Sequence, residues 1–322
     1  MSRKKEELDY EISEIATFYL QGIAQKVSIE GKSKDLPVVI NLHGGPGSPF
    51  PFYVGSRGLH KEYTDHFILV CWDQLGSGVN NRTIDDTYSI DSYVEMTNAL
   101  VKEIRVLFPG NKIFLYAISW GSEISANYVG KYPYMVDGVI VFGQIVKNAF
   151  LNEEVISCLE KSDIPKKKLD AIKKINPKSC SKKETGLVSN AIMKYTEGYY
   201  NKNTVKDPNG LEFKDVFKSP DYRLKDKLAV IGINGCKKNN SLWDAVLQSD
   251  VSEILKKVEI PYRIIQGETD IVASTKTVSE LVEEANNENL SVRVLANFGH
   301  IGGLGLDEII AEEINNVAIN CY

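Results

Sequence analysis

Cysteine is scarce in this sequence of 322 residues. The five cysteines are scattered and share no short spacing: Cys71, Cys158, Cys180, Cys236 and Cys321. Disulfide frameworks and zinc sites both need paired or regularly spaced ligands. We therefore expect neither a disulfide scaffold nor a bound metal, and the sequence indicates no other cofactor.

The sequence also lacks a long apolar run and an excess of positive charge. No segment approaches the roughly 20 apolar residues of a membrane span, and the charged N-terminal stretch MSRKKEEL does not resemble a signal peptide. The formal net charge is −5, whereas nucleic acids and membrane surfaces select for basic partners. We expect a cytoplasmic protein that binds neither. The sequence does not predict its oligomeric state.

Apolar runs and helical patterns alternate along most of the chain. Residues 36–42 and 67–72 are short β-branched runs that end at turns, which is typical of strands buried in a parallel sheet. A helix is expected over 91–108, with Ser89 or Asp91 able to cap its start. The alternation continues through the expected strands 112–118, 136–142, 262–266 and 291–295. One expected helix ends at residue 132, and two others span 275–285 and 307–317. This order predicts an α/β fold with a mostly parallel sheet.

A segment rich in lysine and asparagine interrupts this alternation. Residues 151–245 carry 19 basic and 13 acidic side chains, a net charge of +6. One interpretation is a solvated surface, and the other is an inserted helical cap whose charge complements an acidic core. Because α/β order resumes afterwards, we favour a core of residues 1–144 and 246–322 with a cap insertion at 145–245.

A serine follows one apolar strand directly. The run IFLYAI at 113–118 leads into Ser119, and a helix follows. In a nucleophile elbow, G-x-S-x-G, a strained strand-to-helix turn exposes the serine and requires small residues around it. Ala117 and Gly121 occupy the two small positions, and Ala117 adds one methyl group to the usual glycine. The pattern predicts Ser119 as a nucleophile.

A serine hydroxyl needs an adjacent base to become nucleophilic near pH 7. In enzymes built on this elbow the chain order is serine, then aspartate or glutamate, then histidine. The sequence has four histidines, and His43, His60 and His66 precede Ser119. Only His300 follows the serine, in a loop after the last predicted strand, and we therefore predict it as the general base.

The histidine in turn needs a carboxylate that fixes its tautomer and stabilises its cation. The loop after strand 262–266 offers two candidates, Glu268 and Asp270. We favour Asp270 and keep Glu268 as the alternative. Asp270 could instead cap the next helix, but that helix is expected to begin several residues later.

Acyl transfer also needs two backbone donors for the oxyanion. The amide of Trp120, directly after the serine, is one candidate. The other should lie in the turn after strand 38–42, where Gly44 and Gly45 let the backbone approach a substrate closely. A phosphate-binding loop would also be rich in glycine, but its lysine and hydroxyl residue are missing here.

These motifs together resemble the proline iminopeptidase family, serine peptidase family S33, of the α/β-hydrolase superfamily. The matching segments are HGGPG at 43–47, DQLGSG at 73–78, SWGS at 119–122, GETD at 267–270 and Gly299-His300. The resemblance implies an α/β-hydrolase fold with a helical cap over the triad Ser119, Asp270 and His300, and no metal. It further implies Gly45 as the second oxyanion donor and a structural role for Asp73.

The resemblance also implies a small-molecule or short-peptide substrate. Peptidases of this family anchor the substrate's free amino group on acidic residues. Some of these acids lie in the cap, and in some members one lies beside the catalytic aspartate. Here Asp270 is followed by the uncharged Ile271, and Glu197 is the best acidic candidate in the expected cap. Gly44 and Glu197 are together the expected substrate-binding residues.

The sequence is compatible with three functions. The first is an aminopeptidase for substrates with an N-terminal proline or another small residue, and the second is a carboxylesterase or general acyl hydrolase. The third is a catalytically silent binding protein of the same fold. Such proteins usually lose a triad member or the elbow, and the sequence retains both.

Overall fold

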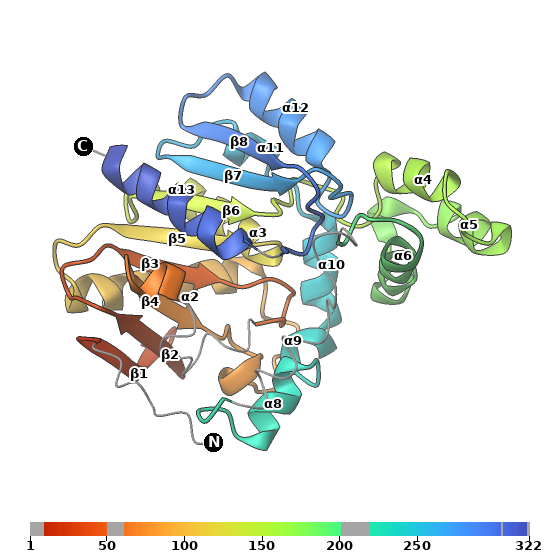
Figure 1. The fold of residues 1–322 in the computed structure, drawn as a ribbon. Coiled ribbons are helices and arrows are strands. Elements are labelled where there is room, and N and C mark those ends of the chain that lie inside the picture. Colours follow the sequence, from red (N-terminus) through yellow and green to blue (C-terminus); the bar gives the residue numbers. More distant parts are fainter. Residues whose placement is uncertain (1–9, 50–60, 201–218, 304, 321–322) are drawn as a thin grey trace, which may run out of the picture.

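The computed structural model describes residues 10–49, 61–200, 219–303 and 305–320. The strands of this part form one sheet in the order β1-β2-β4-β3-β5-β6-β7-β8 (Figure 1). Their bounds are β1 Ile12–Leu20, β2 Ile23–Gly31, β3 Val38–Leu42, β4 Ile68–Trp72, β5 Ile113–Ile118, β6 Gly138–Phe142, β7 Tyr262–Gly267 and β8 Leu290–Leu295. The pairs β1–β2 and β2–β4 are antiparallel, and the pairs from β4 to β8 are parallel. The expected mostly parallel sheet is confirmed.

The six predicted strands correspond to β3 to β8, and each bound lies within two residues of the prediction. β3 to β6 are buried along their whole length, which accounts for their continuous apolar sequences, whereas the edge strand β8 is partly exposed. In β3, Val38 and Ile40 pack into the core on one face, and Val39 packs into the core on the other.

An N-terminal hairpin was not predicted from the sequence. β1 and β2 pair along their full length and are joined by Gln21 and Gly22, which both have positive φ. Tight two-residue hairpin turns need that backbone conformation because it matches the twist of the strands. The hairpin adds the two strands at one edge of the sheet (Figure 1).

Helices cover both faces of the sheet (Figure 1). One face packs against α2 (Ile90–Leu107), α3 (Trp120–Lys131) and α12 (Thr275–Ala285), and the other against α1 (Lys61–Thr64) and α13 (Leu306–Asn320). Ser89 is the N-cap of α2, and its hydroxyl accepts from the amide of Ser92. A short 3₁₀ turn, η1 (Gly78–Asn80), follows β4. Within the described residues, every helix is too short or too polar to cross a lipid bilayer.

A run of helices is inserted between β6 and β7. α4 (Glu153–Glu160), α5 (Lys166–Lys173), η2 (Pro177–Ser179) and α6 (Lys182–Tyr195) stand away from the sheet, whereas α8 (Leu224–Val230), α9 (Gly235–Lys238) and α10 (Asn240–Gln248) lie beside it, followed by α11 (Ser252–Leu255) (Figure 1). The lobe of α4 to α6 has its own apolar cluster, which also includes Ile271 and Val272. The expected boundary at residue 245 falls inside α10.

Candidate active site

Ser119 lies in the turn between β5 and α3, with φ 50° and ψ −117°. This backbone conformation is strained for any residue with a side chain, as in a nucleophile elbow. Gly121 makes the turn sterically feasible, because a Cβ there would lie 2.0 Å from the carbonyl oxygen of Leu42. The start of α3 therefore touches the end of β3, and the serine stands at the carboxyl edge of the sheet.

His300 and Asp270 lie next to this serine. His300 Nε2 is 2.9 Å from Ser119 Oγ, and His300 Nδ1 is 2.8 Å from Asp270 Oδ2. A carboxylate only accepts hydrogen bonds, so the ring proton belongs on Nδ1 and Nε2 can accept from the hydroxyl. The structure thus brings together three predicted residues from the loops after β5, β7 and β8.

The carboxyl group of Asp270 is buried and held by several donors. Besides the imidazole, these are the amides of Val272 and Ala273 at 2.9 Å and Gln266 Nε2 at 3.2 Å. These contacts fix the orientation of the carboxylate toward the ring. The alternative candidate, Glu268, has an exposed side chain.

The predicted oxyanion donors come from the turn after β3 and from the first residue of α3. A Cβ at Gly44 would lie 3.4 Å from the Cβ of Ser119, so this turn packs against the nucleophile. Gly45 has φ 126°, a conformation that other residues rarely adopt. Trp120 is the first residue of α3, so its amide has no acceptor within the helix.

His43 is buried and controls the direction of the glycine turn. Its Nε2 accepts from the amide of Gln74 at 3.0 Å, so Nδ1 carries the proton and donates to the carbonyl of Gly44 at 2.8 Å. Burial lowers the pKa of His43 to about 4, which keeps the ring neutral near pH 7. In a trans peptide the C=O and N–H point to opposite sides. The contact to Gly44 therefore also sets the direction of the Gly45 N–H.

Gln74 connects the glycine turn to the start of α3. Its Nε2 donates to the carbonyl of His43 at 3.2 Å, and its Oε1 accepts from the indole N–H of Trp120 at 2.8 Å. The side chain is completely buried. Gln74 was not predicted as a site residue from the sequence, where the available signal was an amide side chain just beyond a buried strand, within the motif DQLGSG.

Asp73, the preceding residue, binds the insertion. Its Oδ2 accepts from the amide of Val79 and from the hydroxyl of Tyr222, each at 2.9 Å. Burial raises the pKa of Asp73 to about 6. The carboxyl group thus links the turn after β4 to the segment before α8.

A second contact between insertion and core is made by residues 197–199, which we call the strap. Its three carbonyl groups accept from Thr269 Oγ1 at 2.9 Å, from the amide of His300 at 3.0 Å and from the amide of Ile301 at 2.6 Å. The strap therefore binds the loops of both the acid and the base. The side chain of Glu197, the predicted substrate-binding acid, is exposed.

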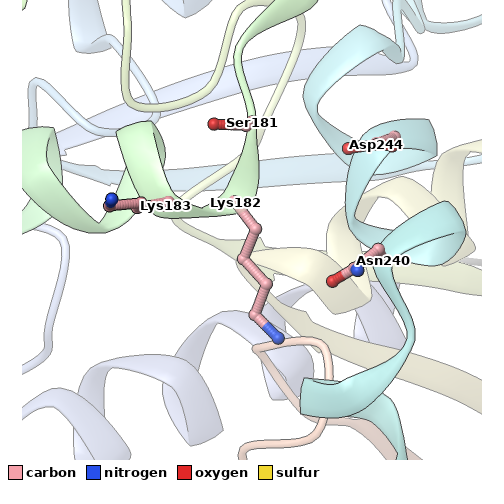
Figure 2. Close-up of a pocket in the computed structure, with 5 residues that line it drawn as sticks. All are labelled: Ser181, Lys182, Lys183, Asn240 and Asp244. Atoms are coloured by element: carbon pink, nitrogen blue, oxygen red, sulfur yellow. The ribbon is translucent and has the colours of Figure 1, made fainter.

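A pocket of about 590 Å³ lies between the start of α6 and α10 (Figure 2). Its lining contains none of the predicted site residues and consists of Ser181, Lys182, Lys183, Asn240 and Asp244. Lys182 extends away from Lys183 in Figure 2, and its ammonium lies 5.8 Å from the centre of the Trp243 ring. In the part of the chain that the structure describes, no three His, Cys, Asp or Glu side chains gather so as to hold a metal ion.

Comparison with known proteins places this geometry in context. Residues 63–301 match the sequence profile of the serine aminopeptidase family S33. The chain is 23% identical over 275 residues to the proline iminopeptidase of Thermoplasma volcanium, covering 85% of this chain and 86% of that protein. It is 32% identical over 111 residues to the probable aminopeptidase YbaC of Bacillus subtilis, over only 34% of each chain.

The fold is also similar to that of a solved proline iminopeptidase from Mycobacterium smegmatis. The TM-score is 0.66 at 16% identity, over 96% of this chain and 100% of that one. At this identity the similarity establishes the fold, which is that of the α/β-hydrolases. Because the S33 profile matches more than half of its length, the chain belongs to the serine aminopeptidase family S33.

Proposed function

We propose that this protein is a serine hydrolase in which Ser119 is the nucleophile, His300 the general base and Asp270 the orienting carboxylate. The observation that carries the proposal is the pair of contacts from the serine hydroxyl to Nε2, at 2.9 Å, and from Nδ1 to the carboxylate, at 2.8 Å. Serine, imidazole and carboxylate in this order are the parts of a catalytic triad.

In the proposed reaction, Ser119 Oγ attacks the carbonyl carbon of the substrate while His300 Nε2 takes the hydroxyl proton. The imidazolium, stabilised by Asp270, then gives the proton to the leaving amine or alcohol, and an acyl-enzyme remains on the serine. Water then attacks the acyl carbon while the same imidazole takes its proton. The bond from the acyl carbon to Ser119 Oγ breaks, the imidazolium returns the proton to Oγ, and the acid product is released. One base therefore serves both halves of the cycle.

The negative charge on the tetrahedral oxygen needs donors that are already in place. We assign the amides of Trp120 and Gly45 to this role. Gly44, which has no side chain, leaves room for the substrate next to Ser119, in agreement with the short distance between these residues.

For the substrate, we propose small amides and short peptides with an N-terminal proline or another small residue. Membership in family S33 and the similarity to proline iminopeptidases support this class. We further propose that residues 145–245 act as a cap that closes the site. The strap supports that role, because it ties the insertion to the loop of His300. Glu197 at its start is the candidate for binding the substrate's amino group.

A carboxylesterase or general acyl hydrolase is the second candidate, and one observation favours it. The residue after Asp270 is Ile271, which is buried in the apolar cluster of the lobe and packs against Gly198. This position cannot offer a charge to an amine. The proposed triad would cleave an ester by the same steps.

A fluorophosphonate probe tests the nucleophile. We expect it to label the wild-type protein and not Ser119→Ala, and absence of labelling on folded wild type would favour the silent binding protein. Hydrolysis of a prolyl arylamide and of short p-nitrophenyl esters then separates the two enzyme classes. In a peptidase, Glu197→Gln should raise KM for the arylamide and leave ester hydrolysis unchanged.

A further inference from the structure

We propose that Gln74 is a positioning residue that fixes the relative position of the two segments that supply the oxyanion donors. We call these segments the two arms of the oxyanion hole: the first contains Gly45, and the second begins with Trp120. This inference rests on the proposed function, because it concerns the amides of Gly45 and Trp120. Gln74 lies just after β4, one arm follows β3, and the other begins α3. A single side chain from a third loop therefore contacts both donor segments.

The first arm is reached through His43. Gln74 contacts this residue twice: its backbone amide donates to the imidazole Nε2 at 3.0 Å, and its side-chain Nε2 donates to the carbonyl of His43 at 3.2 Å. The ring then donates to the carbonyl of Gly44 at 2.8 Å. Since the Gly44–Gly45 peptide is planar, rotation of that carbonyl would turn the Gly45 N–H by the same angle. Gln74 thereby orients the amide of Gly45.

The second arm is reached directly. Gln74 Oε1 accepts from the indole of Trp120 at 2.8 Å, and that indole is completely buried. An indole N–H can only donate, so the amide oxygen must face Trp120 and the NH₂ group must face His43. The side-chain amide of Gln74 can therefore satisfy both partners in only one of its two flip orientations. This rigid bridge holds the first residue of α3, whose backbone amide is the other proposed donor.

The alternative explanation is a purely structural hydrogen bond, and the chain contains a matched example of one. Gln25 is a buried residue of β2, and its Oε1 accepts from the indole of Trp72 in β4 at 2.9 Å. Both glutamines therefore satisfy a buried indole. Only Gln74 also binds a segment of the proposed oxyanion hole. The Gln25→Met variant is accordingly the control for Gln74→Met.

The experiment compares ester hydrolysis by wild type, Gln74→Met and Gln25→Met. Each substitution leaves one buried indole without a partner, so both should lower the thermal midpoint. Loss of one oxyanion donor costs about 100- to 1000-fold in kcat in other enzymes, and misplacement of two should cost about 10- to 100-fold. We expect that fall in kcat, with KM unchanged, for Gln74→Met alone. Affinity for a boronic acid that forms a tetrahedral adduct should fall by the same factor.

Gln74→Glu provides a readout that a structural role would not produce. A protonated carboxyl group can donate to the carbonyl of His43 and accept from Trp120, as the amide does, whereas an ionised one can only accept. The ratio of mutant to wild-type kcat should therefore fall as pH rises. A ratio that is independent of pH, or a Gln74→Met enzyme with the kcat of Gln25→Met, would overturn the positioning role. If folded wild type neither reacts with the fluorophosphonate nor cleaves any ester, the proposed function itself fails and takes this inference with it.

Discussion

The amide of His300 donates to the carbonyl oxygen of Gly198 at 3.0 Å, which binds the loop of the proposed base to the inserted segment. Gly299, the residue directly before His300 in that loop, has no room for a side chain. A Cβ there would lie 2.8 Å from the carbonyl carbon of Tyr199 and 2.9 Å from the carbonyl oxygen of Glu197. Strap and loop are therefore packed backbone to backbone.

Replacing Gly299 by alanine should separate the strap from the loop and displace the imidazole. A misplacement of about 1 Å at a catalytic group can cost about 100-fold in rate, so we expect a fall of that order in kcat for the ester. Gly186→Ala is the control, because nothing lies within 4 Å of a Cβ at this position in α6. The control should keep its kcat and gain up to about 1 kcal/mol of stability. Equal kcat values for both variants would contradict the role of the strap.

Two neighbouring carboxylates allow a direct test of the acid. Asp270→Asn removes the acceptor that keeps the His300 proton on Nδ1, and we expect kcat to fall by about 10⁴-fold, as for the corresponding change in a serine protease. Glu268→Gln, two residues away with an exposed side chain, should leave kcat within about twofold of wild type. Steady-state ester hydrolysis measures both. The reverse pattern would identify Glu268 as the acid instead.

The parallel part of the sheet and the three residues of the candidate triad could be predicted from the sequence for the same physical reason. Strands buried on both faces are continuous apolar runs, and parallel strands place their C-terminal loops at one edge. Ser119 follows such a run, Asp270 and His300 follow two further predicted strands, and chain order eliminated the other histidines. Their proximity is thus a consequence of topology, whereas their catalytic roles stay a prediction.

Other features depend on contacts that no local pattern encodes. Gln74 became apparent only when its two partners, His43 and Trp120, were seen at either end of its amide. The hairpin of β1 and β2 was missed because neither strand is a continuous apolar run: β1 is largely exposed, and β2 buries the polar residues Gln25, Ser28 and Glu30. Gln21-Gly22 is nevertheless an acceptable hairpin turn. Exposure of the Glu197 side chain likewise follows from how the strap lies on the core.

The carboxyl groups of Asp73, which is buried, and of Asp307, which is partly buried, should lower the stability of the protein as pH rises from about 4 to above 6. Burial raises the pKa values of Asp73 and Asp307 to about 6, above the value near 4 expected in the unfolded chain. The folded state then binds more protons than the unfolded state in this window, so the free energy of unfolding decreases with pH. For Asp73 the shift corresponds to about 3 kcal/mol at most.

Asp73→Asn should therefore flatten the pH dependence of stability. Urea unfolding at pH 4.5 and pH 7.5 gives the slope, and we expect the variant to lose a smaller part of its unfolding free energy between the two values. The asparagine can still accept from Val79 and Tyr222, which keeps the local hydrogen bonds. Asp307→Asn should act in the same direction, because its carboxyl group, bonded to Tyr63, titrates in the same window. If the unfolding free energy of both variants changes with pH as much as that of wild type, then Asp73 and Asp307 are not the groups whose raised pKa values cause the pH dependence.

The backbone of Ser119 stores strain that a glycine variant should release. At φ 50° and ψ −117° a residue with a Cβ is disfavoured by about 1 to 3 kcal/mol, and glycine is not. Ser119→Gly and Ser119→Ala both remove the nucleophile, so neither should react with the fluorophosphonate probe. The difference between their free energies of unfolding, measured in urea, isolates the backbone strain at residue 119. We expect the glycine variant to be more stable by about 1 kcal/mol. An alanine variant at least as stable as the glycine variant would mean that the turn is not strained, and that the small residues around Ser119 serve packing alone.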